Sequence, residues 1–302
     1  MKKRLALMLV LLFVVAPITI YGIIKIFNQD KNIPSISYFG GLKDYRMWQG
    51  VASDGNNIYV FSDRDEKFEL NNIISVYSLD GKFIKEKTEA YTQKSRTGKF
   101  MSFGDGSVIN GSLYVPVYDF NGGSAQLSVN LRESRVVKYD LNSLKIVDEY
   151  YIGEGSAESV DFYDNSFWIV YHDINEIRRF DEQFNLLEKY RLSSSFEKEG
   201  GYQGIIFEDG ELYANLHGSN HFGMEYAYGL DHYHFDGKNF NFVERIKPPT
   251  YGSGQGIDRV DETYLWVDRP ANRIVKTTLL KNGNLHSTTG ESIKEETVSR
   301  SE

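Results

Sequence analysis

The sequence QGIIFEDGELYA at residues 203–214 decides the fold. It opens with Gln203 and Gly204, continues as a short apolar run, turns at Asp209-Gly210 and resumes as an aromatic-containing strand pattern nine residues after Gln203. Two apolar runs separated by Asp-Gly are typical of a β-hairpin, because these turn residues tolerate positive φ. The same arrangement occurs at five places, with successive copies 45 to 55 residues apart. A period of this size indicates a repeat architecture with one supersecondary unit per copy.

The five copies share an opening position nine residues ahead of a strand pattern. The opening positions are Gln49, Gly104, Glu158, Gln203 and Gln255, and the patterns that follow are residues 58–60, 113–115, 167–169, 212–214 and 264–266. A third strand pattern follows in every copy, and a fourth in the first four copies. Four antiparallel strands make one propeller blade, so the sequence predicts an all-β propeller. Five blades fit the spacing best, and a six-bladed ring stays open if both termini hold further strands.

The fifth copy lacks a clear fourth strand after Leu280. In the other copies, the fourth strand pattern precedes the next copy by a similar number of residues, and residues 35–41 lie at that distance before the first copy. We therefore expect residues 35–41 to complete the last blade. Residues 285–289 are the competing candidate. The propeller is therefore assigned to residues 35–282. The polar tail at residues 283–302 is expected to be disordered.

The N-terminus predicts the compartment. An uncharged run at residues 5–24 follows the basic residues 2–4, and twenty residues are enough to cross a hydrocarbon core of roughly 30 Å. Because no A-x-A-like exit is visible, we expect an uncleaved signal anchor at residues 1–27 and a short stalk at residues 28–34; secretion after signal cleavage is the alternative. The positive-inside rule then gives a single-pass plasma-membrane protein with a cytoplasmic N-terminus and an extracytoplasmic propeller.

Composition narrows the function classes. The chain has 302 residues, of which 41% are hydrophobic, and so can bury a sizeable core. Its net charge of −8 argues against nucleic acid as a partner, because phosphate binding depends on Lys and Arg patches. The absence of cysteine excludes disulfides, thiolate metal sites and a cysteine nucleophile.

The recurring "Leu-Tyr-Val" and "Ile-x-x-Tyr-Asp" strand patterns over about residues 48–280 resemble NHL-type and gluconolactonase-like (senescence-marker-type) propellers. The blade number and the Gln-Gly strand openings are also similar to the plant and bacterial glutaminyl cyclotransferases. The resemblance is at the level of the fold, which does not by itself determine function.

The opening positions are expected to form a polar ring at one face of the propeller. Gln49, Glu158, Gln203 and Gln255 would bind a ligand there or, equally, bond to neighbouring blades and seal the channel, because buried amides need partners either way. Long loops open on the same face and usually carry function. They contribute Arg64 and Arg269, which could grip an anionic group of a ligand or pair with nearby aspartates.

Glu158 departs from the glutamine pattern. The resemblance to gluconolactonase-like propellers implies that a glutamate at this position is one ligand of a central divalent cation such as Ca²⁺. That family also uses an Asn and an Asp on other blades, where this chain has Gln and Gly. The implied metal set is therefore incomplete.

Three histidines are candidates for acid–base work. His172 begins the upper loop of the third blade, and His217 and His221 are expected in the long loop of the fourth. Their intrinsic pKa near neutrality suits proton transfer, whereas surface or loop packing is the plainer interpretation. Gly, Ser and Asn between His217 and His221 argue against a helical zinc motif.

The sequence therefore predicts a membrane-anchored extracytoplasmic β-propeller that binds a small polar ligand, a glycan or a protein. The alternative is a metal-dependent, lactonase-like hydrolase or lyase that uses Glu158 with the histidines. The absence of a recognisable catalytic set favours the binding module.

Overall fold

The computed structural model describes residues 37–39, 42, 48–62, 72–98, 100–119, 132–172, 176–192, 200–219, 225–279 and 285–287. Within these residues the regular structure is entirely β, and no helix is long and apolar enough to cross a membrane. The predicted anchor and stalk at residues 1–34 lie outside them.

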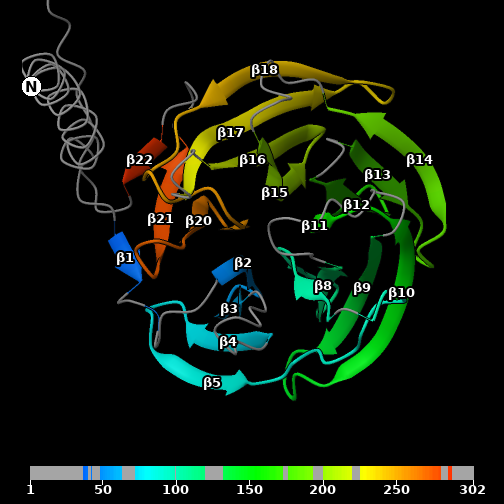
Figure 1. Ribbon diagram of the computed structural model, residues 1–302. Coiled ribbons are helices and arrows are strands. Elements are labelled where there is room, and N and C mark those ends of the chain that lie inside the picture. Colours follow the sequence, from blue (N-terminus) through cyan, green and yellow to red (C-terminus); the bar gives the residue numbers. More distant parts are fainter. Residues whose placement is uncertain are drawn as a thin grey trace, which may run out of the picture. The chain divides into compact units, whose positions relative to one another are not determined.

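The strands form five antiparallel sheets arranged as blades around a common centre (Figure 1). Blade 1 contains β2 (Trp48–Ser53), β3 (Asn57–Ser62), β4 (Ile73–Ser78) and β5 (Phe83–Lys87). Blade 2 contains β6 (Ser102–Phe103), β7 (Ser107–Ile109), β8 (Ser112–Tyr118), β9 (Glu133–Asp140) and β10 (Ile146–Glu154). Blade 3 contains β11 (Ala157–Tyr163), β12 (Ser166–Tyr171), β13 (Glu176–Phe180) and β14 (Leu186–Arg191). Blade 4 contains β15 (Gly200–Glu208), β16 (Glu211–Ser219), β17 (Glu225–Phe235) and β18 (Phe240–Ile246). Blade 5 contains β19 (Ile257–Val260), β20 (Thr263–Asp268) and β21 (Arg273–Leu279), with β1 (Ser37–Phe39) and β22 (Leu285–Ser287) at its outer edge. The predicted five-bladed propeller is confirmed.

The turns between first and second strands have the expected chemistry. Asn110, Asp164, Asn165 and Asp209 all adopt φ of 49° to 52°. Asn and Asp tolerate this left-handed region better than other non-glycine residues.

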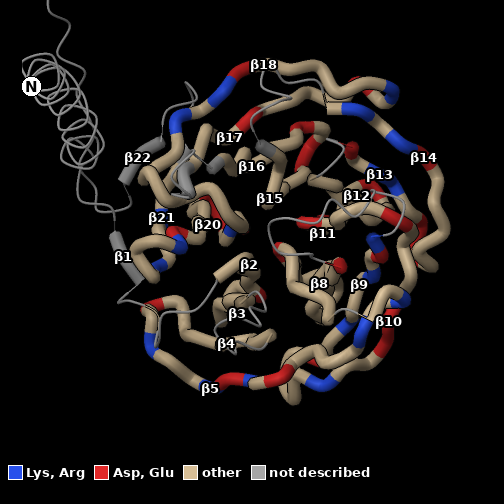
Figure 2. The backbone as a smooth tube through the Cα atoms, in the orientation of Figure 1, with Lys and Arg blue, Asp and Glu red and all other residues tan. Residues whose placement is uncertain are grey.

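The core lies between adjacent blades rather than at the axis. Each second strand is buried, and its aromatic residues reach the neighbouring blade. Trp168 of β12, for example, packs edge-on against Phe207 and Phe240 of blade 4, with ring centroids 4.8 and 5.8 Å apart. Charged residues instead concentrate along the outer strands (Figure 2). The aromatic repeat thus serves to join blades.

Both candidate closing segments pair with the same strand. β1 pairs with residues Ile274–Lys276 of β21, and β22 pairs with residues Thr277–Leu279. The seven-residue β21 is longer than either three-residue segment, so each covers one half of its edge. The propeller therefore extends to Ser287, beyond the predicted boundary at residue 282. The remainder of the tail, residues 288–302, lies outside the described residues.

The first strand of blade 2 is interrupted. The chain breaks between β6 and β7, whereas β2 and β11 are continuous first strands. At the break, Asp105 forms a parallel bridge with Ser159 of blade 3. The ladder is interrupted because Asp105 turns toward the centre of the ring.

Candidate functional site

Four predicted ring residues come together at the start of the innermost strands. Gln49 lies on β2, Glu158 on β11, Gln203 on β15, and Gln255 just before β19. Their side chains are buried, with exposures between 1% and 7%. We call these four residues the polar ring.

Gln49 joins the polar ring together. Its Nε2 donates to Glu158 Oε2 at 3.2 Å and to Gln203 Oε1 at 2.9 Å. Its Oε1 accepts a hydrogen bond from Arg269 Nη1 at 3.0 Å. Because a carboxylate only accepts and a guanidinium only donates, these neighbours fix the direction of the amide. Side chains from three other blades therefore hold the Gln49 amide, which lies between the Arg269 guanidinium and the Glu158 carboxyl group.

Arg269 bonds to the polar ring, whereas the adjacent Asp268 bonds to other residues. Asp268 accepts hydrogen bonds from Arg273 Nε at 2.8 Å and from Thr250 Oγ1 at 3.0 Å. Arg269 itself donates to Gln49 of the polar ring. Arg269 is only 6% exposed. Its charge therefore lies at the floor of the central hollow between the blades, which we call the funnel, and not on the outer surface.

Gln255 differs from the other glutamines. Its Nε2 bonds to His217 Nδ1 at 3.1 Å, and its backbone carbonyl accepts from Asn215 Nδ2 at 2.5 Å. Its Oε1 is buried and meets no donor among the described residues. A buried polar atom left without a partner costs about 1–3 kcal/mol, so Gln255 Oε1 is the atom of the ring that most favours an added donor.

His217 is neutral at physiological pH. Burial, followed by the positive charge of Arg269 and the proximity of His172, lowers the pKa of His217 to about 3. With Nδ1 accepting from Gln255, its proton resides on Nε2, which makes it a hydrogen-bond donor. His217 lies on β16, paired with Ala227, and not in a loop as predicted. The hairpin is longer than expected because residues 225–228 supply a partner strand rich in tyrosine.

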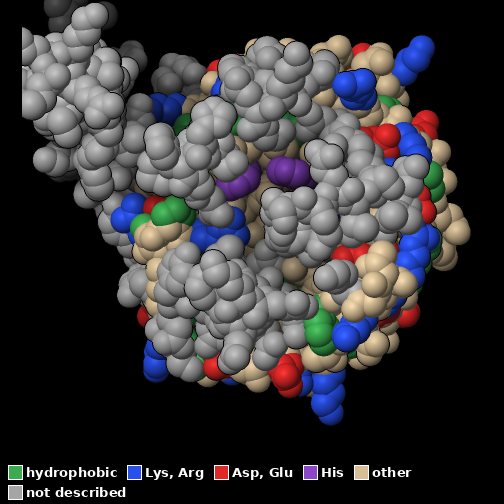
Figure 3. Space-filling view, in the orientation of Figure 1, with side chains coloured by type: hydrophobic (Ala, Val, Ile, Leu, Met, Phe, Trp, Pro, Cys, Tyr) green, Lys and Arg blue, Asp and Glu red, His purple; other side chains and the backbone are tan. Residues whose placement is uncertain are grey.

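His172 is the neighbour of His217. It follows β12 directly, and its backbone N–H bonds to Ser156 O at 3.0 Å. Its ring packs on Gly201, where an added Cβ would come within 2.3 Å of Nδ1. Gly201 is the strand partner of His217, so the two imidazoles flank one glycine. Histidine side chains and a basic side chain line the central hollow of this face (Figure 3).

Asp105 holds the innermost strands together beside the polar ring. Its Oδ1 accepts from Val51 N–H at 2.8 Å, and its Oδ2 accepts from Ile257 N–H at 3.0 Å and Ser159 Oγ at 3.4 Å. Ser159 Oγ in turn accepts from Ile205 N–H at 3.0 Å. One carboxylate thereby links four blades besides its own, directly or through a single hydroxyl. Burial raises the pKa of Asp105 well above its usual range.

The glycines that follow the ring glutamines make room for Asp105. An added Cβ would come within 2.7 Å of the Asp105 carboxylate at Gly50, 3.0 Å at Gly204 and 2.3 Å at Gly256. Contacts this short force a neighbour to move. The Gln-Gly repeat therefore has a steric cause at its second position.

Two further carboxylates lie farther along the innermost strands. Asp161 accepts from Phe207 N–H at 2.6 Å, and Asp258 accepts from Ser53 N–H at 2.6 Å. Burial raises the pKa of Asp161 to about 7 and that of Asp258 to about 8. Both carboxylates bind backbone of the next blade, which indicates a structural role.

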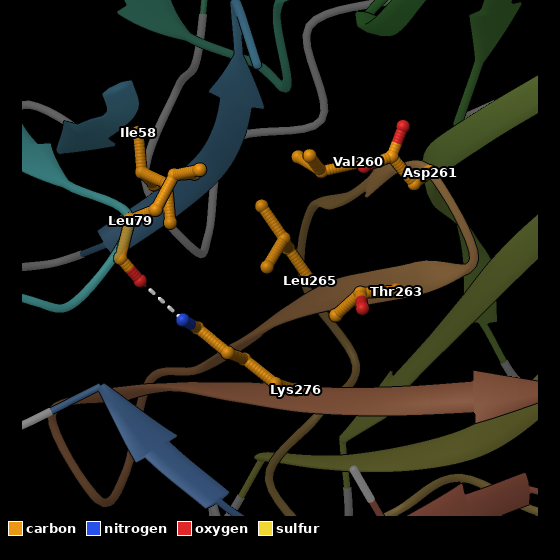
Figure 4. A pocket seen from close by; sticks show the side chains of 7 residues that line it. All are labelled: Ile58, Leu79, Val260, Asp261, Thr263, Leu265 and Lys276. Atoms are coloured by element: carbon orange, nitrogen blue, oxygen red, sulfur yellow. Dashed lines mark hydrogen bonds between the residues drawn. The ribbon is translucent and has the colours of Figure 1, made fainter. Parts of the chain in front are cut away.

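A separate cavity of 330 Å³ lies at the junction of blades 5 and 1 (Figure 4). Its walls are mainly apolar, and the side chain of Lys276 crosses it so that Nζ donates to Leu79 O. Burial lowers the pKa of Lys276. The contact joins blade 5 to blade 1, so this cavity belongs to the junction that closes the ring and not to the funnel.

The remaining predicted residues are not all placed. Arg64 and His221 lie outside the described residues. No three His, Asp or Glu side chains in the described ranges gather as a metal site would require. Glu158 accepts from an amide N–H instead, in a ring whose other members are glutamines. The described residues therefore do not fit the Ca²⁺ set implied by the family resemblance, and the metal stays a prediction.

Asp105 is the residue that sequence reasoning missed. The nine-residue register aligns it with Gly50, Ser159, Gly204 and Gly256, one position beyond the ring residues. A charged residue among glycine and serine at equivalent positions was a visible signal. Its meaning depended on knowing that these positions meet at the centre.

No protein-family model matches the chain, and no curated protein matches it. Solved structures do match. A xylan β-1,4-xylosidase from Bacillus halodurans has a TM-score of 0.59 at 13% identity, over 83% of this chain and 57% of that chain. An exo-β-1,3-galactanase from Phanerochaete chrysosporium has a TM-score of 0.56 at 11% identity, over 84% and 66%. The glutaminyl cyclase of Myxococcus xanthus has a TM-score of 0.52 at 10% identity, over 78% and 94%.

The chain thus spans less than two thirds of the two glycosidase chains and nearly all of the cyclase chain. At these identities the likeness establishes the shared five-bladed propeller fold. The closer resemblance to NHL-type and gluconolactonase-like propellers stays a prediction.

Proposed function

We propose that the protein is a membrane-anchored, extracytoplasmic binding module whose funnel takes a small polar ligand at the polar ring. The observation that carries the proposal is Gln255 Oε1, a buried acceptor without a described donor, beside the neutral donor His217. Ligand sites commonly place a few convergent polar groups on a rigid, concave scaffold. The anchor and the compartment rest on the uncharged run at residues 5–24.

Binding is favoured over hydrolysis by the carboxylates of the ring. Hydrolysis of a glycosidic bond ordinarily uses two carboxyl groups on opposite sides of the bond. Among the five opening positions only Glu158 is acidic, and the carboxylate of Asp105 is engaged by backbone N–H groups. His217 is a poor general acid, because with a pKa of about 3 it is neutral near pH 7 and has no imidazolium proton to transfer. The lactonase-like hydrolase or lyase is therefore the weaker candidate, supported by the presence of enzymes among the fold neighbours.

The test is a screen of sugars, organic acids and amino acids for compounds that raise the unfolding midpoint of the full-length protein. A compound that binds the folded state stabilises it by mass action. Gln255→Ala should remove the response and leave the midpoint without ligand nearly unchanged. A large fall of the unliganded midpoint in Gln255→Ala, with no ligand response in wild type, would contradict the proposal and support a sealed channel. Loss of a response on adding EDTA would favour the metal-dependent alternative.

A further inference from the structure

We propose that the cavity at the junction of blades 5 and 1 binds a small neutral arene, with phenols and indoles as the simplest classes. This site is separate from the polar ring and independent of the ligand proposed there.

The position ten residues after each opening residue is aromatic in four blades and aliphatic in the fifth. Its side chain packs toward the next blade. Tyr114 lies against Phe167 of blade 3, with ring centroids 5.0 Å apart. Trp168 lies against Phe207 of blade 4, with centroids 4.8 Å apart. Blade 5 has Leu265 at this position. The aromatic residues of blades 1 to 4 are Tyr59, Tyr114, Trp168 and Tyr213.

The cavity lies where blade 5 has this leucine in place of a ring (Figure 4). Leu265 and Ile58 form an apolar floor, with exposures of 1% and 0%. Leu79 and Val260 add apolar walls, and the exposed turn residue Asp261 places the mouth at the surface. An apolar cavity of about 150 Å³ is enough to hold benzene. A volume of 330 Å³ therefore has room for one phenol or indole.

A cation faces the aromatic position from the third strand in blades 2 and 3. Lys138 pairs with Tyr114, and its Nζ lies 5.5 Å from the ring centroid. Arg179 pairs with Trp168, and its Cζ lies 5.6 Å from that ring. In blade 5 the residue paired with the leucine is Lys276. Blade 5 thus retains the cation of the pair but not the ring, and a bound arene would restore a cation–π contact.

The other two blades show how far this pairing extends. In blade 4 the His232 ring stacks on Tyr213, with centroids 4.6 Å apart. In blade 1 the residue opposite Tyr59 is Val76. A basic side chain therefore accompanies the ring in three of the four aromatic blades.

The existing contacts of Lys276 are compatible with a ring. Its Nζ donates to Leu79 O, and an ammonium group carries three N–H donors. Arg179 shows that a cation with another partner still lies on a ring, because it donates to Ser166 Oγ at 2.9 Å while it lies over Trp168. Cation–π attraction acts between the charge and the face of the ring. The arene therefore binds beside the partners of Lys276 and not in place of them.

The experiment titrates the full-length protein by calorimetry with p-cresol, indole and 4-methylcyclohexanol, the saturated analogue of p-cresol. The two arenes should bind and raise the unfolding midpoint. The saturated analogue should bind roughly three- to tenfold more weakly, because it has no π-face for the cation. Lys276→Met keeps the aliphatic stem and should weaken p-cresol binding by a similar factor. Lys138→Met is the matched control and should bind p-cresol normally, because Tyr114 already occupies the equivalent place in blade 2.

Leu265→Tyr supplies the ring covalently. It should raise the unfolding midpoint without ligand, as cavity-filling substitutions commonly do, and abolish p-cresol binding. Should this variant not fold, the comparison of Lys276→Met with Lys138→Met tests the site in its place.

Equal affinity for p-cresol and 4-methylcyclohexanol would overturn the proposal, as would undiminished p-cresol binding in Lys276→Met or in folded Leu265→Tyr. Failure of the wild type to bind either arene would also overturn it and leave the cavity as a packing defect. Each of these results leaves the function proposed for the polar ring standing, because the cavity is not part of the funnel.

Discussion

Gly256 lies directly against Asp105: a Cβ added to Gly256 would come within 2.3 Å of Asp105 Oδ1. The contact joins blade 5 to blade 2 across the centre of the ring. It explains why the ring position is followed by glycine in three blades. A side chain there would displace the carboxylate that fixes the innermost strands.

Asp105→Ala should lower the free energy of unfolding by about 3 kcal/mol or more. The backbone N–H groups of Val51 and Ile257 would lose their acceptor, and each unsatisfied buried group costs about 1–3 kcal/mol. Ser159→Ala should cost less, because it removes one hydroxyl between Asp105 and Ile205. Urea unfolding measures both. A smaller effect for Asp105→Ala than for Ser159→Ala would refute the central role of the carboxylate.

Gly256→Ala should destabilise the protein, and the loss should shrink in the Asp105→Gly background. Part of the clash, that with the carboxylate, is then gone, whereas the 2.5 Å approach to Gly50 Cα remains. A double-mutant cycle gives the coupling energy. Strict additivity of the two substitutions would show that the contact carries no energy.

Gln203→Ala and Gln255→Ala should differ in their effect on stability. Gln203 Oε1 accepts from Gln49 at 2.9 Å, so its removal leaves a buried amide N–H without an acceptor and should cost about 1–2 kcal/mol. Removing the Gln255 side chain loses one hydrogen bond to His217 but also eliminates an unsatisfied oxygen, so the net change should be under about 1 kcal/mol. Equal losses in the two variants would indicate that both glutamines only seal the channel.

Stability should depend on pH through Asp258. Burial raises its folded pKa to about 8, above the ordinary value of 3.8, so the folded state holds this proton more tightly than the unfolded state. The associated stabilisation is present at low pH and is lost as the pH rises through 8. Between pH 8 and pH 6 the wild type should therefore gain about 2 kcal/mol that Asp258→Asn does not gain.

The control for this comparison is Asp261→Asn, at an exposed position in the adjoining turn. It should follow the wild-type dependence on pH. Parallel curves for wild type and Asp258→Asn would show that Asp258 is ionised in the folded protein.

A chain that ends at Leu279 should remain folded but lose about 1–2 kcal/mol, because β22 covers only half of the β21 edge. Removing β1 as well should cause a further loss, since β21 would then have an open outer edge along its whole length. Thermal unfolding of the two truncated chains tests this shared closure. An unchanged midpoint on removal of β22 would contradict it.

Much of the fold was predictable because local chemistry repeats along the chain. Asp209-Gly210 and its counterparts determine hairpins, and the nine-residue register then places the innermost strands. The register also identified Gln49, Glu158, Gln203 and Gln255 as one ring. These features depend on periodicity, which the sequence displays directly.

The remaining features depend on contacts between distant residues. The direction of the Gln49 amide follows from Arg269, which is 220 positions away in the chain. The role of Asp105 follows from backbone N–H groups in blades 1 and 5. The extension of β16 through His217 depended on pairing with residues 225–227, which sequence patterns assigned to a loop.

The central claim is that the polar ring is a ligand site. A crystal structure grown with the compound that gives the largest rise in unfolding midpoint tests it most directly. We expect the compound to donate a hydrogen bond to Gln255 Oε1, with Gln49 keeping its present orientation. A funnel floor that holds only water, with the compound bound elsewhere on the protein, would contradict the claim.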